Sequence, residues 1–283
     1  MKVAHLILAH ENPRQLERLI TRLSYDGDAV FIHLDKKTDI IPFLPLQQLP
    51  GVFFINNRVK VYWGTYSIVE ATVNSFEEIM NAGVSYDYIN LLSGADYPLQ
   101  PIHKFRSFLA QHPGKAFMSF MDIQESWTEA VTRITQYHLN NFNFPGQYLL
   151  QRFINLTMPE RAIPDNLIPV GRSQWFTASA ACINYILDYW HQNPRLRRFL
   201  QFTWGCDEFI FQTILYNSPF YGHMVNNNLR HIDWSAQRVS PKVLTLADQE
   251  VLLNSDAFFA RKFDIHQPQI LDIIDERLLA QSL

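Results

Sequence analysis

Short apolar runs alternate with amphipathic segments through the first 121 residues, and this alternation limits the possible folds more than any other feature. Residues 13–23 place Leu16, Leu19, Ile20 and Leu23 on one helical face. Apolar runs of strand length occupy residues 3–8, 29–34, 52–55, 86–92 and 115–121. Buried strands that alternate with helices predict an α/β fold with a mostly parallel mixed sheet flanked by helices.

The rest of the chain carries further helix and strand signals. Residues 67–70 read Ser-Ile-Val-Glu, which fits a capping box and predicts a helix with Val69, Val73, Phe76 and Met80 on one face. Further helices are expected at residues 101–112, 182–191, 207–216 and 270–280, and further strands at residues 173–179, 229–234 and 258–262.

One stretch departs from this pattern. Residues 122–170 are rich in Asn, Pro and aromatic residues and predict irregular structure over the sheet. The chain has neither an internal repeat nor a Gly/Ser linker, so we expect one domain spanning residues 1–283.

Charge and composition exclude several classes of protein. A formal net charge of −3 and a pI near 6.4 leave no basic field, so no nucleic-acid partner is expected. Two cysteines, Cys182 and Cys206, are too few for a disulfide framework, and buried reduced thiols are expected. No stretch has the length and apolar character of a signal peptide or membrane span, so we expect a cytoplasmic protein, or one peripheral at a membrane.

Polar residues follow three of the predicted strands. In parallel sheets ligands bind at the carboxyl ends of the strands. This rule selects Ala9 with His10, residues 35–37, and residues 93–96.

Familiar phosphate and metal motifs are missing from the sequence. The ten glycines form neither G-x-G-x-x-G nor a Walker loop. Asp26 and Asp28 spell the Asp-x-Asp pattern that holds a divalent cation in many nucleotide-sugar transferases, but they precede a strand, where a solvent-exposed turn is the better interpretation. After the 86–92 strand the chain offers the single carboxylate of Asp96. We therefore expect no metal or other cofactor, and protein cations at a pyrophosphate instead.

An ordered set of segments resembles a known family. The matching residues are 7–10, 31–37, 63–64 with 67–69, 90–99, 173–176, 207–213, 229–234 and 259–264. Together they resemble the core-2/I-branching β-1,6-N-acetylglucosaminyltransferase family, glycosyltransferase family 14, which also holds the peptide O-xylosyltransferases. The matches run in order over nearly the whole chain, and their order is more specific than any one of them.

The resemblance implies a GT-A type nucleotide-sugar-binding fold and an inverting, metal-independent glycosyltransferase. The donor would be a UDP-sugar, most simply of N-acetylglucosamine or xylose, and the acceptor a hydroxyl of a carbohydrate, glycolipid or glycopeptide. Residues 1–121 would form the nucleotide-binding half, and residues 122–283 the acceptor-binding and catalytic half. The animal members have a membrane anchor and extra cysteines that have no counterpart in this sequence, so their acceptor is not assigned to this protein.

The family's catalytic base falls on Glu208, in the Asp207-Glu208-Phe209 segment. A carboxylate there would take the proton of the acceptor hydroxyl as its oxygen attacks. The alternative from the pattern is that Asp207 caps a helix and Glu208 complements its dipole. Trp234 matches the family's acceptor-contacting tryptophan, and its alternative is a place in the core.

The remaining candidates are donor-binding residues. Lys262 matches the family's phosphate-binding lysine and Arg261 would assist it, because a leaving UDP develops negative charge; the alternative is an exposed surface pair. Residues on a strand alternate between faces, so at most one of the two is expected to aim at the pyrophosphate. Asp35, Ala9 and His10 would bind the uridine, with a loop histidine as the alternative for His10. Asp96 either contacts the donor or caps the 93–94 turn.

Two other functions compete with sugar transfer. A nucleotidyltransferase that makes sugar nucleotides would need a glycine-rich phosphate loop near the N-terminus, where the chain reads Ala-His-Glu-Asn at residues 9–12. An inactive carbohydrate-binding module would be expected to lose Glu208 or Lys262, and both are present.

Overall fold

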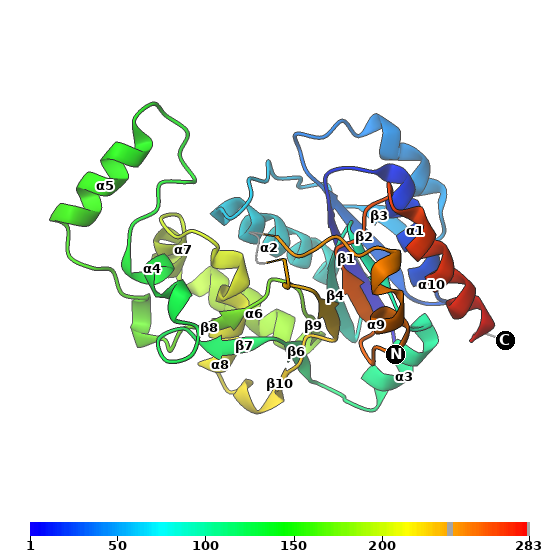
Figure 1. Ribbon diagram of the computed structural model, residues 1–283. Coiled ribbons are helices and arrows are strands. Elements are labelled where there is room, and N and C mark those ends of the chain that lie inside the picture. Colours follow the sequence, from blue (N-terminus) through cyan, green and yellow to red (C-terminus); the bar gives the residue numbers. More distant parts are fainter. Residues whose placement is uncertain (237–239, 282–283) are drawn as a thin grey trace. The chain divides into compact units, whose positions relative to one another are not determined.

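The structure is a computed structural model, which describes residues 1–236 and 240–281 (Figure 1). The chain forms two compact units: unit 1 comprises Met1–Asn56, Ser85–Pro113 and Leu229–Leu283, and unit 2 comprises Asn57–Val84 and Gly114–Asn228. Each unit therefore draws on distant parts of the chain. The sequence predicted a nucleotide-binding half in residues 1–121 and an acceptor-binding and catalytic half in residues 122–283. These functional assignments stay a prediction.

Unit 1 is built on four parallel strands in the order β4-β1-β2-β3. They are β1 (Val3–Ala9), β2 (Ala29–Leu34), β3 (Val52–Phe54) and β4 (Tyr88–Ser93). Every residue of β2 and β4 is buried, as expected of parallel strands covered on both faces. Because Ala9 pairs with Leu34, and Leu8 with Ser93, the carboxyl ends of β1, β2 and β4 lie side by side.

A second, smaller sheet in unit 1 has the order β11-β12-β5. Its strands are β5 (Asp96–Pro98), β11 (Arg230–Ile232) and β12 (Phe259–Arg261). Strand β12 runs antiparallel to β5, so that Arg261 pairs with Asp96. The chain leaves β4 through the turn at residues 94–95 and enters β5 directly, which brings this small sheet to the carboxyl end of β4.

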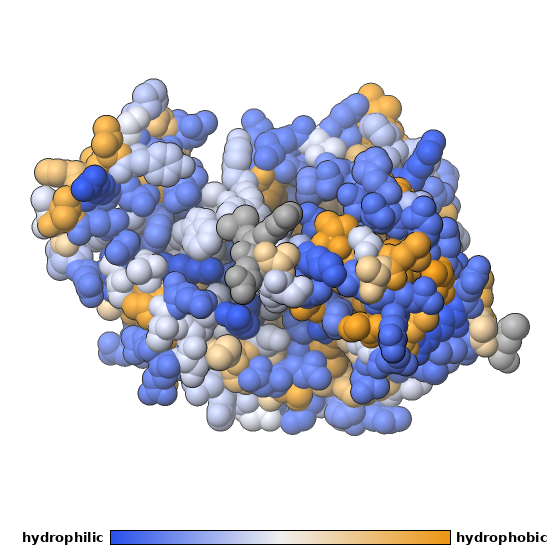
Figure 2. Space-filling view, in the orientation of Figure 1, coloured by the Kyte–Doolittle hydropathy of each residue, from blue (hydrophilic) through white to orange (hydrophobic). Residues whose placement is uncertain are grey.

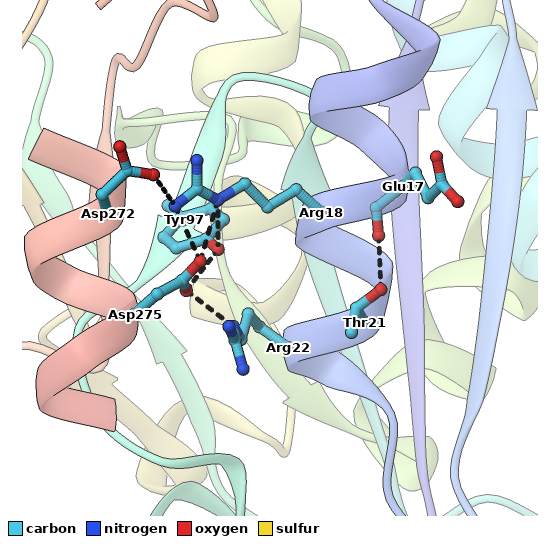
Figure 3. Close-up of polar contacts among 7 residues, drawn as sticks. All are labelled: Glu17, Arg18, Thr21, Arg22, Tyr97, Asp272 and Asp275. Carbon is cyan, nitrogen blue, oxygen red and sulfur yellow. Dashed lines mark hydrogen bonds and ion pairs between the residues drawn. The ribbon is translucent and has the colours of Figure 1, made fainter. Parts of the chain in front are cut away.

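The helices of unit 1 are α1 (Pro13–Leu23), α3 (Ile102–Ala110), α9 (Gln249–Leu253) and α10 (Pro268–Ala280), with 3-10 turns η1 (Ile41–Gln48) and η6 (Leu246–Asp248). Helix α1 buries Leu16, Leu19, Ile20 and Leu23, which confirms the predicted face. A polar cluster joins α10 to α1 and β5 (Figure 3). In it Asp275 accepts hydrogen bonds from Arg22 Nε at 2.6 Å, Arg18 Nε at 2.8 Å and the Tyr97 hydroxyl at 2.6 Å.

Unit 2 contains short strands in two sets. One has the order β10-β6-β9, with β6 (Ala116–Met118) parallel to β10 (Met224–Asn226) and antiparallel to β9 (Thr177–Ser179). The other pairs β7 (Phe120–Asp122) with β8 (Val170–Arg172) in antiparallel fashion. With the parallel strands of unit 1, these pairings confirm an α/β fold with mostly parallel, mixed strand pairing.

The helices of unit 2 range from one turn to four turns in length. They are α2 (Tyr66–Met80), α4 (Val131–Thr135), α5 (Gln147–Thr157), α6 (Ala180–Gln192), α7 (Pro194–Leu200) and α8 (Ile210–Tyr216), with 3-10 turns η2 (Thr128–Ala130), η3 (Pro164–Asn166), η4 (Cys206–Glu208) and η5 (Tyr221–His223). Three residues of the predicted face of α2, Val69, Val73 and Phe76, are buried, whereas the fourth, Met80, is partly exposed.

Several predicted boundaries were wrong. The N-cap of α2 is Thr65, whose hydroxyl accepts from the Ser67 N–H, so the cap lies two residues before the predicted one. The run 115–121 is two strands, because β6 and β7 pair with different partners. The segment 173–179 forms a strand only from Thr177. Residues 122–170 are not irregular throughout, since they contain α4 and α5.

The Asp26–Asp28 segment is a turn ahead of β2, as predicted, but only Asp26 and Gly27 face solvent, and the Asp28 side chain does not. Asp28 has a structural role there: its carboxylate is almost fully buried, pairs with Arg106 and accepts from the Val3 N–H at 2.7 Å. The thiols of Cys182 and Cys206 are both free and buried, as expected. Within residues 1–236 and 240–281, no helix combines the length and the apolar character needed to cross a bilayer.

Candidate functional site

The carboxyl ends of three strands in unit 1 bring predicted donor residues together. The Asp35 N–H donates to the Ala9 carbonyl at 2.8 Å, and the Gly94 N–H donates to the Leu8 carbonyl at 3.0 Å. A Cβ added at Gly94 would lie 3.5 Å from the Ala9 Cβ, so the 93–96 turn packs closely against the end of β1. The strand ends that the sequence selected therefore form one continuous edge.

Asp35 and His10 differ in exposure at this edge. Asp35 is buried, with its Oδ1 accepting from the Lys37 N–H at 2.9 Å and its Oδ2 3.5 Å from Lys37 Nζ. The His10 side chain is 69% exposed and lies 3.5 Å from Glu11 Oε1, while the His10 carbonyl accepts from the Thr38 hydroxyl. His10 is thus a solvent-facing loop histidine, and Asp35 an ordered carboxylate.

Asp96 has a clear structural role. It is fully buried and accepts from the Ser93 hydroxyl at 2.7 Å and from the Ser93 N–H at 3.1 Å, so it caps the turn, as one of the two alternatives predicted. Arg261 Nε lies 3.2 Å from the same carboxylate. The ion pair follows from the register of β5 and β12, which places these two residues opposite each other.

Arg230 is a buried cation that the sequence analysis did not select. It donates to the Leu91 carbonyl at 3.0 Å and to the side chain of Asn90, whose amide nitrogen lies 3.1 Å from His5 Nδ1. Burial lowers the pKa of Arg230 to about 9, with the Asp96 charge opposing this shift and the Arg261 charge adding to it. The available signal was an arginine inside a predicted strand, since a charge that becomes buried there needs partners.

Gln15 was also missed. Its amide nitrogen donates to the Phe263 carbonyl at 3.1 Å and to the Gly94 carbonyl at 3.3 Å. This buried side chain thereby ties α1 to both the 93–96 turn and the segment that follows β12. A glutamine on the apolar face of a predicted helix was the signal for it.

Lys262 follows the central strand of the small sheet, β12, and Trp234 lies two residues after the outer strand β11. Lys262 comes directly after β12 and is half-buried, and its carbonyl accepts from the Leu244 N–H. In the part of the chain that the structure describes, its ammonium takes part in no ion pair, whereas Arg261 pairs with Asp96. Trp234 is 48% exposed, so the core alternative was wrong for this residue.

Glu208 lies in unit 2, in the η4 turn. Its side chain is 32% exposed, and its Oε2 lies 2.5 Å from Arg133 Nη1. Helix α8 begins only at Ile210, and among the described residues neither it nor η4 has a side-chain cap. The alternative in which Asp207 caps a helix was therefore wrong.

Two tryptophans hold the arginine that pairs with Glu208. The Arg133 guanidinium lies 4.8 Å from the Trp127 ring centre and 4.5 Å from that of Trp204. Trp63, which is 64% exposed, packs edge-on against Trp204. Arginine over indole faces is a favourable cation–π arrangement, so this stack fixes the position of the guanidinium beside the Glu208 carboxylate. The sequence analysis missed Arg133 because it is remote from Glu208 along the chain.

Two glycines make room for the Glu208 turn. Gly205 has a φ of +62°, and a Cβ there would lie 2.7 Å from Arg133 Nη1. A Cβ at Gly171 in β8 would lie 2.3 Å from the Phe209 Cα and 2.5 Å from the Glu208 carbonyl. Larger residues at these positions would push the turn away from Arg133 and β8.

Asp207 is a buried carboxyl next to Glu208. Burial, together with the charge of Glu208, raises the pKa of Asp207 to about 7. Among the described residues, its Oδ1 has no hydrogen-bond partner. The neutral form of Asp207 is therefore strongly favoured below neutral pH.

The fold and the polar strand ends define an α/β protein of the class that binds ligands at the carboxyl edge of a parallel sheet. The family model described as Branch, Core-2/I-Branching enzyme, matches residues 3–251, and the chain belongs to this family.

Curated relatives point the same way. Xylosyltransferase 2 of Canis lupus familiaris is 24% identical over 98% of this chain and 34% of its own length, and the Rattus norvegicus protein of that name is 25% identical over the same shares. Xylosyltransferase 1 of Rattus norvegicus is 23% identical over 83% of this chain and 28% of its own. The chain thus spans about a third of these relatives. Among solved structures, mouse xyloside xylosyltransferase 1 in its apo form aligns with a TM-score of 0.42 and 10% identity, over 95% of this chain and 99% of that one.

Proposed function

We propose that the protein is an inverting glycosyltransferase that moves a sugar, N-acetylglucosamine or xylose, from a UDP-sugar to an acceptor hydroxyl. The observation that carries this proposal is the Glu208 carboxylate, partly exposed and held by Arg133. Family membership supports sugar transfer, and the relatives named xylosyltransferase favour xylose as the transferred sugar.

In this mechanism Glu208 is the general base. The acceptor hydroxyl loses its proton to the carboxylate as its oxygen forms a bond to the anomeric carbon, and the bond from that carbon to UDP breaks with its electron pair. Because Arg133 engages Oε2, Oε1 is the oxygen left for the acceptor proton. Attack on the side opposite the leaving group gives inversion.

Unit 1 would bind the donor. Asp35 and the end of β1 would contact the uridine, and the cations at the end of β12, Arg261 and Lys262, would stabilise the charge that develops on UDP. Arg230 and Arg261 together outweigh Asp96, so this part of unit 1 carries excess positive charge, and Lys262 adds to it. Both Asp96 oxygens already accept hydrogen bonds from Ser93, which favours Lys262 over a metal ion as the phosphate partner.

Exposed tryptophans are the best candidates for acceptor binding. Trp63 and Trp234 are 64% and 48% exposed, and an indole face packs well against the C–H face of a sugar. Trp63 has the additional support of Trp204, which continues to the Arg133–Glu208 pair.

The test is turnover of Glu208→Gln, with exposed Glu160→Gln as the matched control. We expect Glu208→Gln to lower turnover by roughly 10²–10⁴-fold, the usual contribution of a general base, while UDP-sugar binding is retained. Unchanged turnover with saturating acceptor would contradict the assignment. Formation of pyrophosphate from a sugar phosphate and UTP would indicate a nucleotidyltransferase instead.

A further inference from the structure

Helix α5 has its polar side toward the protein and its apolar side toward solvent. Gln147, Gln151 and Asn155 are spaced four residues apart and share one face. Gln147 Oε1 accepts from the Phe144 N–H, Gln151 Oε1 from the Leu139 N–H at 2.8 Å, and Asn155 Oδ1 from the Tyr137 N–H at 2.8 Å. The polar face therefore binds the backbone of the preceding segment.

The opposite face is apolar and open to solvent. Leu149, Phe153 and Leu156 are 76%, 62% and 76% exposed, and Tyr148 beside them is 67% exposed. Figure 1 shows α5 set apart from α4 and α7, and Figure 2 shows hydrophobic side chains gathered over it. A surface helix of a soluble domain normally has the reverse arrangement, so this face is built to be covered.

The charge around α5 indicates what covers it. No acidic residue occurs between Glu129 and Glu160, although acidic residues outnumber Lys and Arg in the whole chain by 27 to 24. Arg152 is exposed and lies between Tyr148 and Leu156 on the helix surface. Phe142 and Phe144, just before the helix, are 37% and 38% exposed.

We propose that α5 lies in the surface of a lipid bilayer that contains anionic lipids. Leu149, Phe153 and Leu156 would enter the acyl boundary, Tyr148 and the two phenylalanines would lie at the headgroup level, and Arg152 would contact lipid phosphate. An apolar face with flanking aromatics, a positive charge and no acidic residue fits such a surface. This inference does not depend on the proposed transfer reaction.

The experiment is flotation of the full chain with vesicles of phosphatidylcholine alone and of phosphatidylcholine mixed with phosphatidylglycerol. The test variant is Leu149→Ser/Phe153→Ser/Leu156→Ser. The matched control is Ile41→Ser/Val251→Ser/Leu279→Ser, whose residues are 68%, 56% and 55% exposed but lie elsewhere. Since all six side chains are exposed, both variants should fold, which circular dichroism and a thermal melt would check.

We expect the wild type and the control to float with the anionic vesicles, and the α5 variant to lose at least about a hundredfold in partitioning, because three large apolar side chains no longer leave water. Arg152→Gln should lose about fivefold, and only on anionic vesicles, which is what one basic residue contributes at such a surface. High salt should reduce the wild type to the level of Arg152→Gln.

Three outcomes would overturn the proposal. In the first, the wild type stays unbound by either kind of vesicle. In the second, the α5 variant floats as well as the wild type. In the third, the wild type is a dimer on size-exclusion chromatography without vesicles, and the α5 variant is a monomer. That result would make this face a contact between two copies of the chain.

Discussion

At the residue scale, the cation or backbone N–H beside a carboxyl group determines the role that this group can have. Glu208 is held by Arg133, whereas the fully buried Asp96 is occupied by Ser93 and Arg261. Both were candidates from the sequence, and the partners distinguish them. Asp96 organises the turn at the end of β4, whereas Glu208 pairs with Arg133 through Oε2, and the proposed mechanism assigns the acceptor proton to its Oε1. Asp207, which was predicted only as a possible helix cap, neither organises this turn nor acts as the base in the proposed mechanism.

The pKa of Asp207 predicts a pH dependence of stability. Its pKa is about 7 in the folded chain against an ordinary value of 3.8, so the folded state holds the proton more tightly than the unfolded state. The stability it contributes is present below pH 3.8 and is lost as the pH rises towards 7.

Asp207→Asn removes this titration. We therefore expect the free energy of unfolding of the variant to fall less than that of the wild type between pH 3.8 and 7. The difference should be on the order of a few kcal/mol, measured by urea unfolding at a series of pH values. Parallel pH profiles for the two proteins would show that Asp207 titrates normally.

At the element scale, α10 shows how a terminal helix is held by charge as well as by apolar packing. It buries Ile270, Leu271, Ile274 and Leu278, and its Asp275 meets Arg18, Arg22 and Tyr97 (Figure 3). Burial alone would raise the pKa of Asp275, but the hydrogen bonds from these three residues more than offset it and lower the pKa. Asp275 therefore contributes stability above its ordinary pKa of 3.8, and this is lost as the pH falls.

Asp275→Asn should weaken the attachment of α10. Two arginines would lose their shared partner, and we expect a loss of about 3 kcal/mol in the free energy of unfolding, the lower end for breaking a buried ion pair. Asp272→Asn is the matched control on the same helix, because Asp272 is 59% exposed and, among the described residues, forms an ion pair with Arg18 alone. Its loss should stay below about 1 kcal/mol. If chemical denaturation gave equal losses in the free energy of unfolding for the two variants, the Asp275 cluster would contribute no more to stability than the exposed Asp272 pair.

At the scale of the whole molecule, the proposed mechanism relies on cations of the small sheet in place of a metal ion. The small sheet of unit 1 delivers Arg230, Arg261 and Lys262 from two of its strands and the residue after them. A lysine keeps its charge in the presence of a chelator, so the proposed mechanism should not require a metal ion.

We predict that the enzyme keeps full activity in excess EDTA. Lys262→Ala should lose activity and UDP affinity together, the latter by about 10–100-fold, because one charge-assisted hydrogen bond is removed. Lys2→Ala is the matched control, since Lys2 precedes β1 at the opposite edge of the sheet. Activity assays and calorimetry with UDP would check both parts. Loss of wild-type activity in EDTA, restored by manganese, would instead assign the leaving group to a metal ion.

Local pattern was sufficient for much of this molecule. The bounds of α1 and β2 could be predicted to the residue, and so could the edge formed by Ala9, Asp35 and the 93–96 turn, because strand and helix periodicity reflects burial along a continuous segment. Helix α5 was missed because periodicity predicts a helix whose apolar face is buried, whereas in α5 the polar face packs against the protein.

Tertiary structure alone decided which charges meet. Arg133 reaches Glu208 from 75 residues away, and Arg230 reaches Asn90 from 140 residues away. Tertiary structure also decided that the Asp96 carboxylate pairs with Arg261 and that the Trp234 side chain is exposed. Periodicity in a sequence reports how each residue relates to its neighbours along the chain. The partner of a charge is set by strand register and by the path of loops, which bring together segments that carry no sequence signal of each other.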